Sequence, residues 1–111
     1  MSKYPKRGEV YWVTLDPVIG TETCKTRPAV IVSNDDGNEI SKRIVACPIT
    51  SNANHVYPFE VKIEMNGKTG KIMADQLKAL DKQRLGKKMF FLGPEIMEQV
   101  DKALKLVLSL S

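Results

Sequence analysis

The sequence has few cysteines and no long apolar run, and these two absences exclude several classes of protein. Its 111 residues include 2 cysteines, too few and too unpatterned for a disulfide framework or a zinc site. No apolar stretch approaches the roughly 20 residues needed to span a bilayer. Residues 1–12 mix charged and apolar side chains and lack the continuous apolar core of an export signal. We therefore expect a cytoplasmic protein with no membrane segment.

Repeats, linkers and low-complexity tracts are also lacking, so the sequence predicts one domain over residues 1–111. Apolar residues make up 42% of the chain and charged residues 27%, a balance typical of a folded protein. The net charge of +4 is compatible with a polyanionic partner such as nucleic acid. A solvated lysine-rich surface would give the same charge, so the charge alone does not decide between the two.

Hydrophobic periodicity predicts a mostly β fold with a C-terminal α-helix. β-Branched and aromatic runs favour strands, and the Asn66-Gly67 dipeptide is a strong hairpin signal. Pro48 places the third strand at an edge of the sheet or at its exit from the sheet. Pro94 begins a helix with one apolar stripe up to Leu108. The expected strands cover residues 9–15, 29–32, 43–49, 59–65, 70–74 and 88–92, with a turn at 34–37 and a helical turn at 75–80. Such short strands and one helix predict a small, strongly bent antiparallel barrel.

Two polar segments are candidates for the functional site. Residues 20–28 (GTETCKTRP) carry hydroxyls, a carboxylate and an arginine on a loop that leads into a strand. Residues 48–52 (PITSN) end a strand in hydroxyl and amide groups. Functional side chains concentrate on loops that a rigid scaffold positions, but spacing alone does not show that the two segments meet.

These segments belong to an ordered set of motifs that closely resembles the MazF/PemK toxins. The set consists of RGEVYW at 7–12, DPVIGTE at 16–22, RPAVIV at 27–32, PIT at 48–50, YPFEV at 57–61 and ADQ at 74–76. The resemblance covers essentially the whole chain. It implies an SH3-like barrel of the CcdB/PemK type, a homodimer, and a sequence-specific, metal-independent endoribonuclease that acts on single-stranded RNA without a cofactor. It also implies a cognate MazE-like antitoxin whose disordered tail occupies the RNA groove.

The resemblance assigns the essential arginine and threonine of the family to Arg27 and Thr50. Metal-free RNA cleavage uses the ribose 2′-hydroxyl as nucleophile, so the protein must move protons and stabilise charge on the phosphoryl oxygens. The planar, permanently charged guanidinium of Arg27 suits the phosphate, and such a group contributes on the order of 10² to 10³ in rate. Thr50 can donate a hydrogen bond to the same phosphate.

The proton carrier is less defined. Glu22 is the best carboxylate candidate because it shares a loop with Arg27, and Asp75 is the second. In the PemK-like branch the base is an aspartate that matches Asp75, with an arginine two residues before it. Met73 occupies that earlier position here, so the acid–base pair is incomplete, and Asp75 with Gln76 would instead read RNA bases. The residues expected to contact substrate are Thr21, Thr23, Lys25, Pro28, Ser51, Asn52, His55, Asp75 and Gln76.

Other conspicuous residues favour structural interpretations. Cys24 is expected to be an ordinary thiol, and no catalytic role in the family attaches to His55, the single histidine. Tyr57 and Phe59 could stack on bases, but the alternating pattern predicts Phe59 for the core. The cations at 82, 84, 87 and 88 are interpreted as a solvated face, and an extension of the RNA path or a contact with an acidic antitoxin tail are the alternatives.

Two functions of other classes stay open at the level of sequence. One is a toxin of the same fold that binds a protein target, as the gyrase-poisoning CcdB relatives do. The other is a non-catalytic RNA-binding barrel. Because the gyrase poisons lack the arginine and threonine on these loops, Arg27 and Thr50 favour the nuclease.

Overall fold

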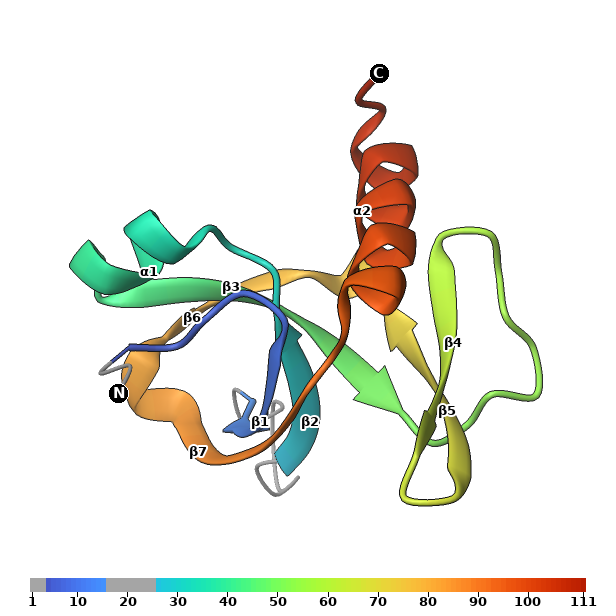
Figure 1. Cartoon of the computed structure of the whole chain (residues 1–111), viewed down its shortest axis with the longest axis horizontal. Helices are drawn as coiled ribbons and strands as arrows, with labels where there is room; N and C mark the ends of the chain where they lie inside the picture. The colour runs from blue at the N-terminus through green and yellow to red at the C-terminus, as the bar shows by residue number, and fades with distance from the viewer. Residues whose placement is uncertain (1–3, 16–25) are drawn as a thin grey trace, which may run out of the picture.

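The computed structural model describes residues 4–15 and 26–111, and in this part of the chain seven strands form one curled sheet (Figure 1). The strand order is β4-β5-β3-β2-β1-β7, with β6 also paired to β3. Because β4 and β7 end this path, the sheet is a half-barrel. The elements are β1 (Glu9–Thr14), β2 (Thr26–Ile31), α1 (Asp35–Ile40), β3 (Arg43–Thr50), β4 (Glu60–Met65), β5 (Lys68–Met73), η1 (Ala74–Gln76), β6 (Lys78–Asp81), η2 (Lys82–Arg84), β7 (Leu85–Phe91) and α2 (Pro94–Leu108).

Strand β3 is central to the sheet because it changes its neighbour halfway along. Its first half pairs with β6, from Arg43 with Asp81 to Ala46 with Lys78, and its end pairs with β5 through Ile49 and Thr50. Pro48 lies between these two ladders and opposite Ala29 of β2. Pro48 therefore does not lie in an edge strand, while the alternative expectation, that the strand leaves the sheet near Pro48, fits the change of neighbour from β6 to β5. A proline is tolerated in this central strand because it sits where one neighbour has ended and the next has not begun.

The core lies between the concave sheet and α2. Met97, Val100 and Ala103 of α2 pack against buried residues that include Val61 and Ile72. This buried apolar stripe confirms the predicted amphipathic helix. A second cluster fills the other half of the curl, between β1, β2, β3 and β6, and is built of Val13, Ala29, Ile31, Ile44, Ala46 and Leu80.

Cys47 lies in the first cluster and is fully buried. Burial raises the pKa of its thiol to about 12, since a thiolate would lack solvation there. Cys47 is therefore an inert packing residue, while Cys24 lies outside the described residues.

Three sequence predictions are wrong in detail. Residues predicted as a turn at 34–37 begin helix α1, which Asn34 caps by accepting a hydrogen bond from the Gly37 N–H (2.7 Å). The helical turn predicted over 75–80 is shorter, because β6 begins at Lys78 and pairs with β3. Phe59 precedes β4, is half-buried and belongs to neither core cluster.

The predicted mostly β fold with a C-terminal helix is confirmed. In Figure 1 helix α2 stands over the sheet, with α1 and the β4–β5 hairpin at opposite ends of the molecule. Among the described residues no helix has the length and apolar character needed to cross a membrane.

Candidate functional site

Arg27 and Thr50 meet because β2 and β3 are antiparallel neighbours. Ala29 pairs with Pro48, and the same register, continued by two residues, places Arg27 opposite Thr50. On the other side of β3, Thr50 pairs directly with Lys71 of β5. Opposed residues of antiparallel strands share a face of the sheet. The three side chains therefore form a row across β2, β3 and β5.

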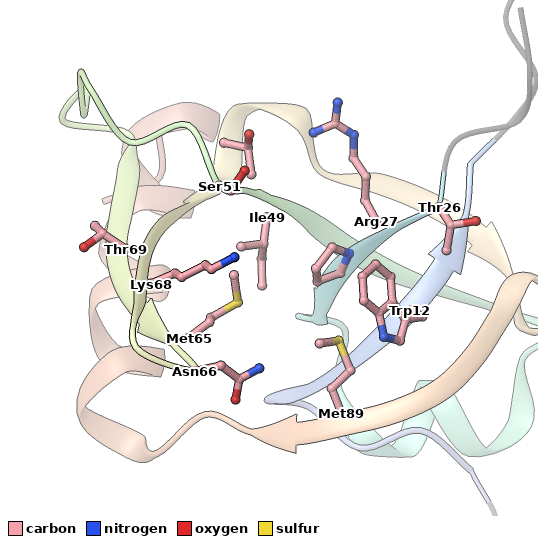
Figure 2. Close-up of a pocket in the computed structure, with 12 residues that line it drawn as sticks. Trp12, Thr26, Arg27, Ile49, Ser51, Met65, Asn66, Lys68, Thr69 and Met89 are labelled. Atoms are coloured by element: carbon pink, nitrogen blue, oxygen red, sulfur yellow. The ribbon is translucent and has the colours of Figure 1, made fainter.

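A cavity of about 600 Å³ opens on one side of Arg27 and Thr50. Figure 2 shows Trp12 and Met89 on one wall, Met65 and Lys68 on the other, and Arg27 and Ser51 at one rim. The lining also includes Thr26, Pro28, Ile49, Thr50, Asn66 and Thr69. An apolar floor with a few polar groups at the rim is typical of a ligand pocket. Trp12 is 39% exposed, so a ligand can reach it.

A second cavity of about 350 Å³ shares Arg27 and Thr50 with the first. Its other lining residues are Leu15, Pro48, Asn52, Lys71, Met73 and Gln76. A smaller cavity of about 160 Å³ continues from it, since both contain Leu15, Pro48 and Gln76, and reaches Lys78. Arg27 and Thr50 therefore stand between two adjoining hollows, so an extended ligand could pass over them.

Thr50 is fixed locally from two sides. Its Oγ1 accepts a hydrogen bond from the Asn52 N–H (3.2 Å), which turns the chain out of β3. Gly70 of β5 lies so close to Thr50 that a Cβ at this position would stand 2.8 Å from the Thr50 carbonyl oxygen. The glycine thus lets β5 approach the end of β3 and sets the position of Thr50.

Lys71 connects this row to the loop between β3 and β4. Its Nζ contacts Glu60 Oε1 (2.9 Å) and donates to the carbonyl oxygen of His55 (2.7 Å). Burial raises the pKa of Glu60, but the Tyr57 N–H and the Lys71 ammonium outweigh it and hold the pKa below its usual value. Glu60 is therefore a carboxylate with its charge compensated, and the loop is held at both His55 and Tyr57.

The structure brings together some of the predicted site residues. Arg27, Pro28, Thr50 and Ser51 line the larger cavity, and Asn52 and Gln76 line the second. His55 and Asp75 are exposed and line neither cavity. Thr21, Glu22, Thr23 and Lys25 lie outside the described residues. The roles assigned to these residues stay predictions.

Sequence reasoning missed the other half of the lining. Trp12, Met65, Asn66, Lys68 and Met89 contribute to the larger cavity, and Lys71 to the second. The hairpin signal at Asn66-Gly67 predicted the pairing of β4 with β5, which the structure confirms. No local signal predicts that β5 also pairs with the end of β3, and this long-range pairing brings Lys71 to Thr50.

The basic residues near 82–88 line none of the cavities described above, and three of them have structural contacts. Lys82 Nζ donates to the Glu39 carbonyl oxygen (3.5 Å). Lys88 Nζ lies 3.1 Å from Glu9 Oε2, and Arg84 Nη1 donates to the Thr14 carbonyl oxygen (3.3 Å). Within residues 4–15 and 26–111, no group of three His, Cys, Asp or Glu side chains is placed to hold a metal ion.

Known structures share this architecture over nearly the whole chain. An endoribonuclease in complex with its cognate antitoxin, from a Mycobacterial species, is 29% identical, with a TM-score of 0.80 over 96% of this chain and 97% of that one. A crystal structure of MazE–MazF from Deinococcus radiodurans is also 29% identical, with a TM-score of 0.84 over 99% and 100% of the two chains. The Mycobacterium tuberculosis toxin MazF-mt6 shares the fold at 17% identity, with a TM-score of 0.78 over 93% and 98%.

The family model described as PemK-like, MazF-like toxin of type II toxin–antitoxin system matches residues 6–108. This match covers β1 to the end of α2 and includes both strands that carry Arg27 and Thr50. The chain therefore belongs to the PemK-like, MazF-like toxin family of type II toxin–antitoxin systems.

Proposed function

We propose that this chain is an endoribonuclease that cuts single-stranded RNA, mainly mRNA, at a specific sequence without a metal ion. The observation that carries the proposal is the position of Arg27 and Thr50 between two adjoining cavities. Relatives that are 29% identical over nearly their whole length are an endoribonuclease and MazF, which supports the same activity here.

In the proposed reaction the ribose 2′-oxygen attacks the adjacent phosphorus, and the bond to the 5′-oxygen of the next nucleotide breaks. The products are a 2′,3′-cyclic phosphate and a 5′-hydroxyl end. Arg27 stabilises the charge on the phosphoryl oxygens, and Thr50 donates a hydrogen bond to the same group. Glu22 is the proposed base that takes the 2′-hydroxyl proton, and water supplies the proton that the leaving 5′-oxygen needs to become the 5′-hydroxyl.

The proposed partners follow from the relatives and from the surface of the molecule. The Mycobacterial endoribonuclease and the Deinococcus MazF are found with an antitoxin, and we expect a cognate MazE-like antitoxin to block the RNA path here. Leu106, Leu108 and Leu110, at and just beyond the end of α2, are each about half exposed. A second copy of the chain would cover these residues, so we propose a cytoplasmic homodimer.

The test compares the purified protein with Arg27→Ala on a long mixed-sequence RNA in excess EDTA, with the new ends mapped. We expect cuts at one short motif with 5′-hydroxyl ends, and a loss of at least about 10²-fold in Arg27→Ala, because the phosphate charge is no longer compensated. The matched control is Arg43→Ala, an exposed arginine at the opposite end of β3, which should cut like the wild type.

Intact RNA with the wild type would contradict the nuclease and favour a toxin that binds a protein target. RNA that is bound but not cut would instead indicate a non-catalytic RNA-binding barrel. Full activity of a folded Arg27→Ala protein would overturn the proposed role of Arg27.

A further inference from the structure

The loop between β3 and β4 carries three aromatic side chains in contact. The rings of Tyr57 and Phe59 are parallel, with centroids 5.3 Å apart and an angle of 2° between their planes. The His55 ring stands edge-on to Tyr57, at a centroid distance of 4.2 Å and an angle of 73°. We name these three residues the aromatic ladder. We propose that the ladder stacks an unpaired base of the RNA substrate beside the cut, an inference that rests on the proposed nuclease function.

Tyr57 is the ring that a base can reach. It is 49% exposed, and Phe59 supports it from one side and is itself half-buried. Parallel aromatic faces are the surfaces on which single-stranded nucleic acids stack, because every base has a π-face.

The ladder is held in place before any ligand arrives. The Tyr57 N–H donates to Glu60 Oε1 (2.9 Å), and the Glu60 N–H donates back to the Tyr57 carbonyl oxygen (2.9 Å). Lys71 Nζ holds the His55 carbonyl oxygen and lies 5.8 Å from the centre of the Tyr57 ring. A platform that is already ordered loses little conformational entropy when a base binds.

The ladder adjoins the site of the proposed cleavage. Lys71, which holds it, pairs with Thr50 and lines the second cavity together with Arg27 and Asn52. RNA bound over Arg27 and Thr50 would therefore need to extend only past Lys71 to reach Tyr57.

The charges along this path favour RNA as the occupant. Lys62 of β4 pairs directly with Lys71, and the neighbouring pair, Val61 with Ile72, is buried on the core side. Lys62 and Lys71 therefore share the outer face with Glu60, which neutralises Lys71, so Lys62 on one side and Arg27 beyond Thr50 on the other supply the further positive charge. Cations that follow a backbone, next to an aromatic stacking surface, are the usual combination for single-stranded nucleic acids.

The experiment pairs protein variants with RNA variants. Short RNA oligonucleotides centred on the mapped cut site are prepared with one flanking base at a time removed to leave an abasic ribose. Specificity constants are measured for the wild type, Tyr57→Leu, Tyr57→Trp and a control, Phe91→Leu. Phe91 is a 62% exposed aromatic residue that lines none of the cavities described.

We expect one abasic position to lower kcat/KM of the wild type by about tenfold, the usual size of a base–aromatic stacking effect. Tyr57→Leu should lower kcat/KM on intact RNA by a similar factor, and the same abasic position should then have little further effect. Tyr57→Trp should retain both the activity and the sensitivity to that position, and Phe91→Leu should behave like the wild type.

The proposal is overturned if every abasic effect is as large in Tyr57→Leu as in the wild type. It is also overturned if Tyr57→Leu weakens only the binding of an antitoxin, because the ladder would then be a peptide site. If the wild type leaves the intact RNA uncut, the proposed nuclease function itself is refuted. If the enzyme is active but its cleavage does not depend on Tyr57, only the stacking proposal is refuted.

Discussion

The same turn occurs at the start of β1 and at the start of β4, with different consequences. In each, a glutamate accepts a hydrogen bond from the N–H three residues before it: Glu9 from Lys6 (2.7 Å) and Glu60 from Tyr57 (2.9 Å). In each, its own N–H donates back to the carbonyl oxygen of that residue. A lysine of the paired strand neutralises each carboxylate, Lys88 on β7 and Lys71 on β5.

The two turns differ in what surrounds them. Glu9 also accepts a hydrogen bond from the Tyr11 hydroxyl (2.9 Å), and its lysine is 54% exposed on the side chain. In the ion pair of Glu60 with Lys71 both side chains are largely buried, with 6% and 12% of their surfaces exposed, and Lys71 pairs with Thr50 of the neighbouring strand. The first turn fastens β1 to an outer strand, and the second fastens β4 to β5 beside the candidate site. The same backbone arrangement thus occurs once away from the candidate site and once next to it.

The largest difference between the turns is expected from removing their lysines. Lys71→Met leaves the Glu60 carboxylate inside with one fewer partner, so we expect a loss of about 2–3 kcal/mol in the free energy of unfolding. Cleavage should fall more than about tenfold, since the loop loses the ammonium that holds it at His55 and the second cavity loses a cation beside Thr50. Lys88→Met should cost at most about 1 kcal/mol, because its side chain is largely solvated, and should leave cleavage unchanged. Urea unfolding and kcat/KM measure both effects, and equal losses in the two variants would refute the contrast.

A smaller effect is expected from filling the space beside Thr50. In Gly70→Ala the new Cβ meets the Thr50 carbonyl oxygen at 2.8 Å, so one strand must move. We expect a loss of about 1–3 kcal/mol in stability and a fall in kcat with little change in KM. Gly93→Ala is the matched control, because a Cβ at Gly93 has no neighbour within 4 Å. Unaltered cleavage by Gly70→Ala would show that the close approach of β5 does not position Thr50.

The smallest effect is expected in the pH dependence of stability. Burial alone would raise the pKa of Glu9 and Glu60, but hydrogen bonds and the lysines lower both below their unfolded values. Each carboxylate therefore adds stability at neutral pH that is lost as the pH falls through its folded pKa. Between about pH 7 and pH 3, the loss of unfolding free energy should be smaller in Glu9→Gln and Glu60→Gln than in the wild type, by about 1 kcal/mol or less each. An unchanged pH slope in both variants would show that neither pKa is lowered.

Local sequence patterns predicted the individual helices and strands better than they predicted which strands pair with one another. Pro94 and the apolar stripe predicted α2, and Asn66-Gly67 predicted the β4–β5 hairpin. For Pro48 the sequence left two alternatives, an edge strand or an exit from the sheet, because a proline signals a missing hydrogen bond but not where in the sheet it is tolerated. Phe59 was assigned to the core because the apolar alternation of the strand was extended to it, but β4 begins one residue later, at Glu60.

The candidate site was predicted only in part for the same reason. The resemblance to MazF/PemK toxins selected Arg27 and Thr50, which the structure places together. Lys71 and Trp12 have no local signature, since their positions depend on β5 pairing with β3 and on the curl that brings β1 to the cavity. Contacts between residues distant in the chain cannot be read from the spacing of near neighbours.

The residues that line the larger cavity come from distant parts of the sequence, and this has a consequence for the synthesis of the protein. The lining runs from Trp12 in the first strand to Met89 in the last. A nascent chain that ends before β5 leaves Thr50 without Lys71 beside it, and one that ends before β7 lacks Met89. Because ribosomes build the chain from the N-terminus, the complete cavity arises only when the strands are all made. The proposed cleavage activity is therefore withheld until translation of the protein is nearly finished.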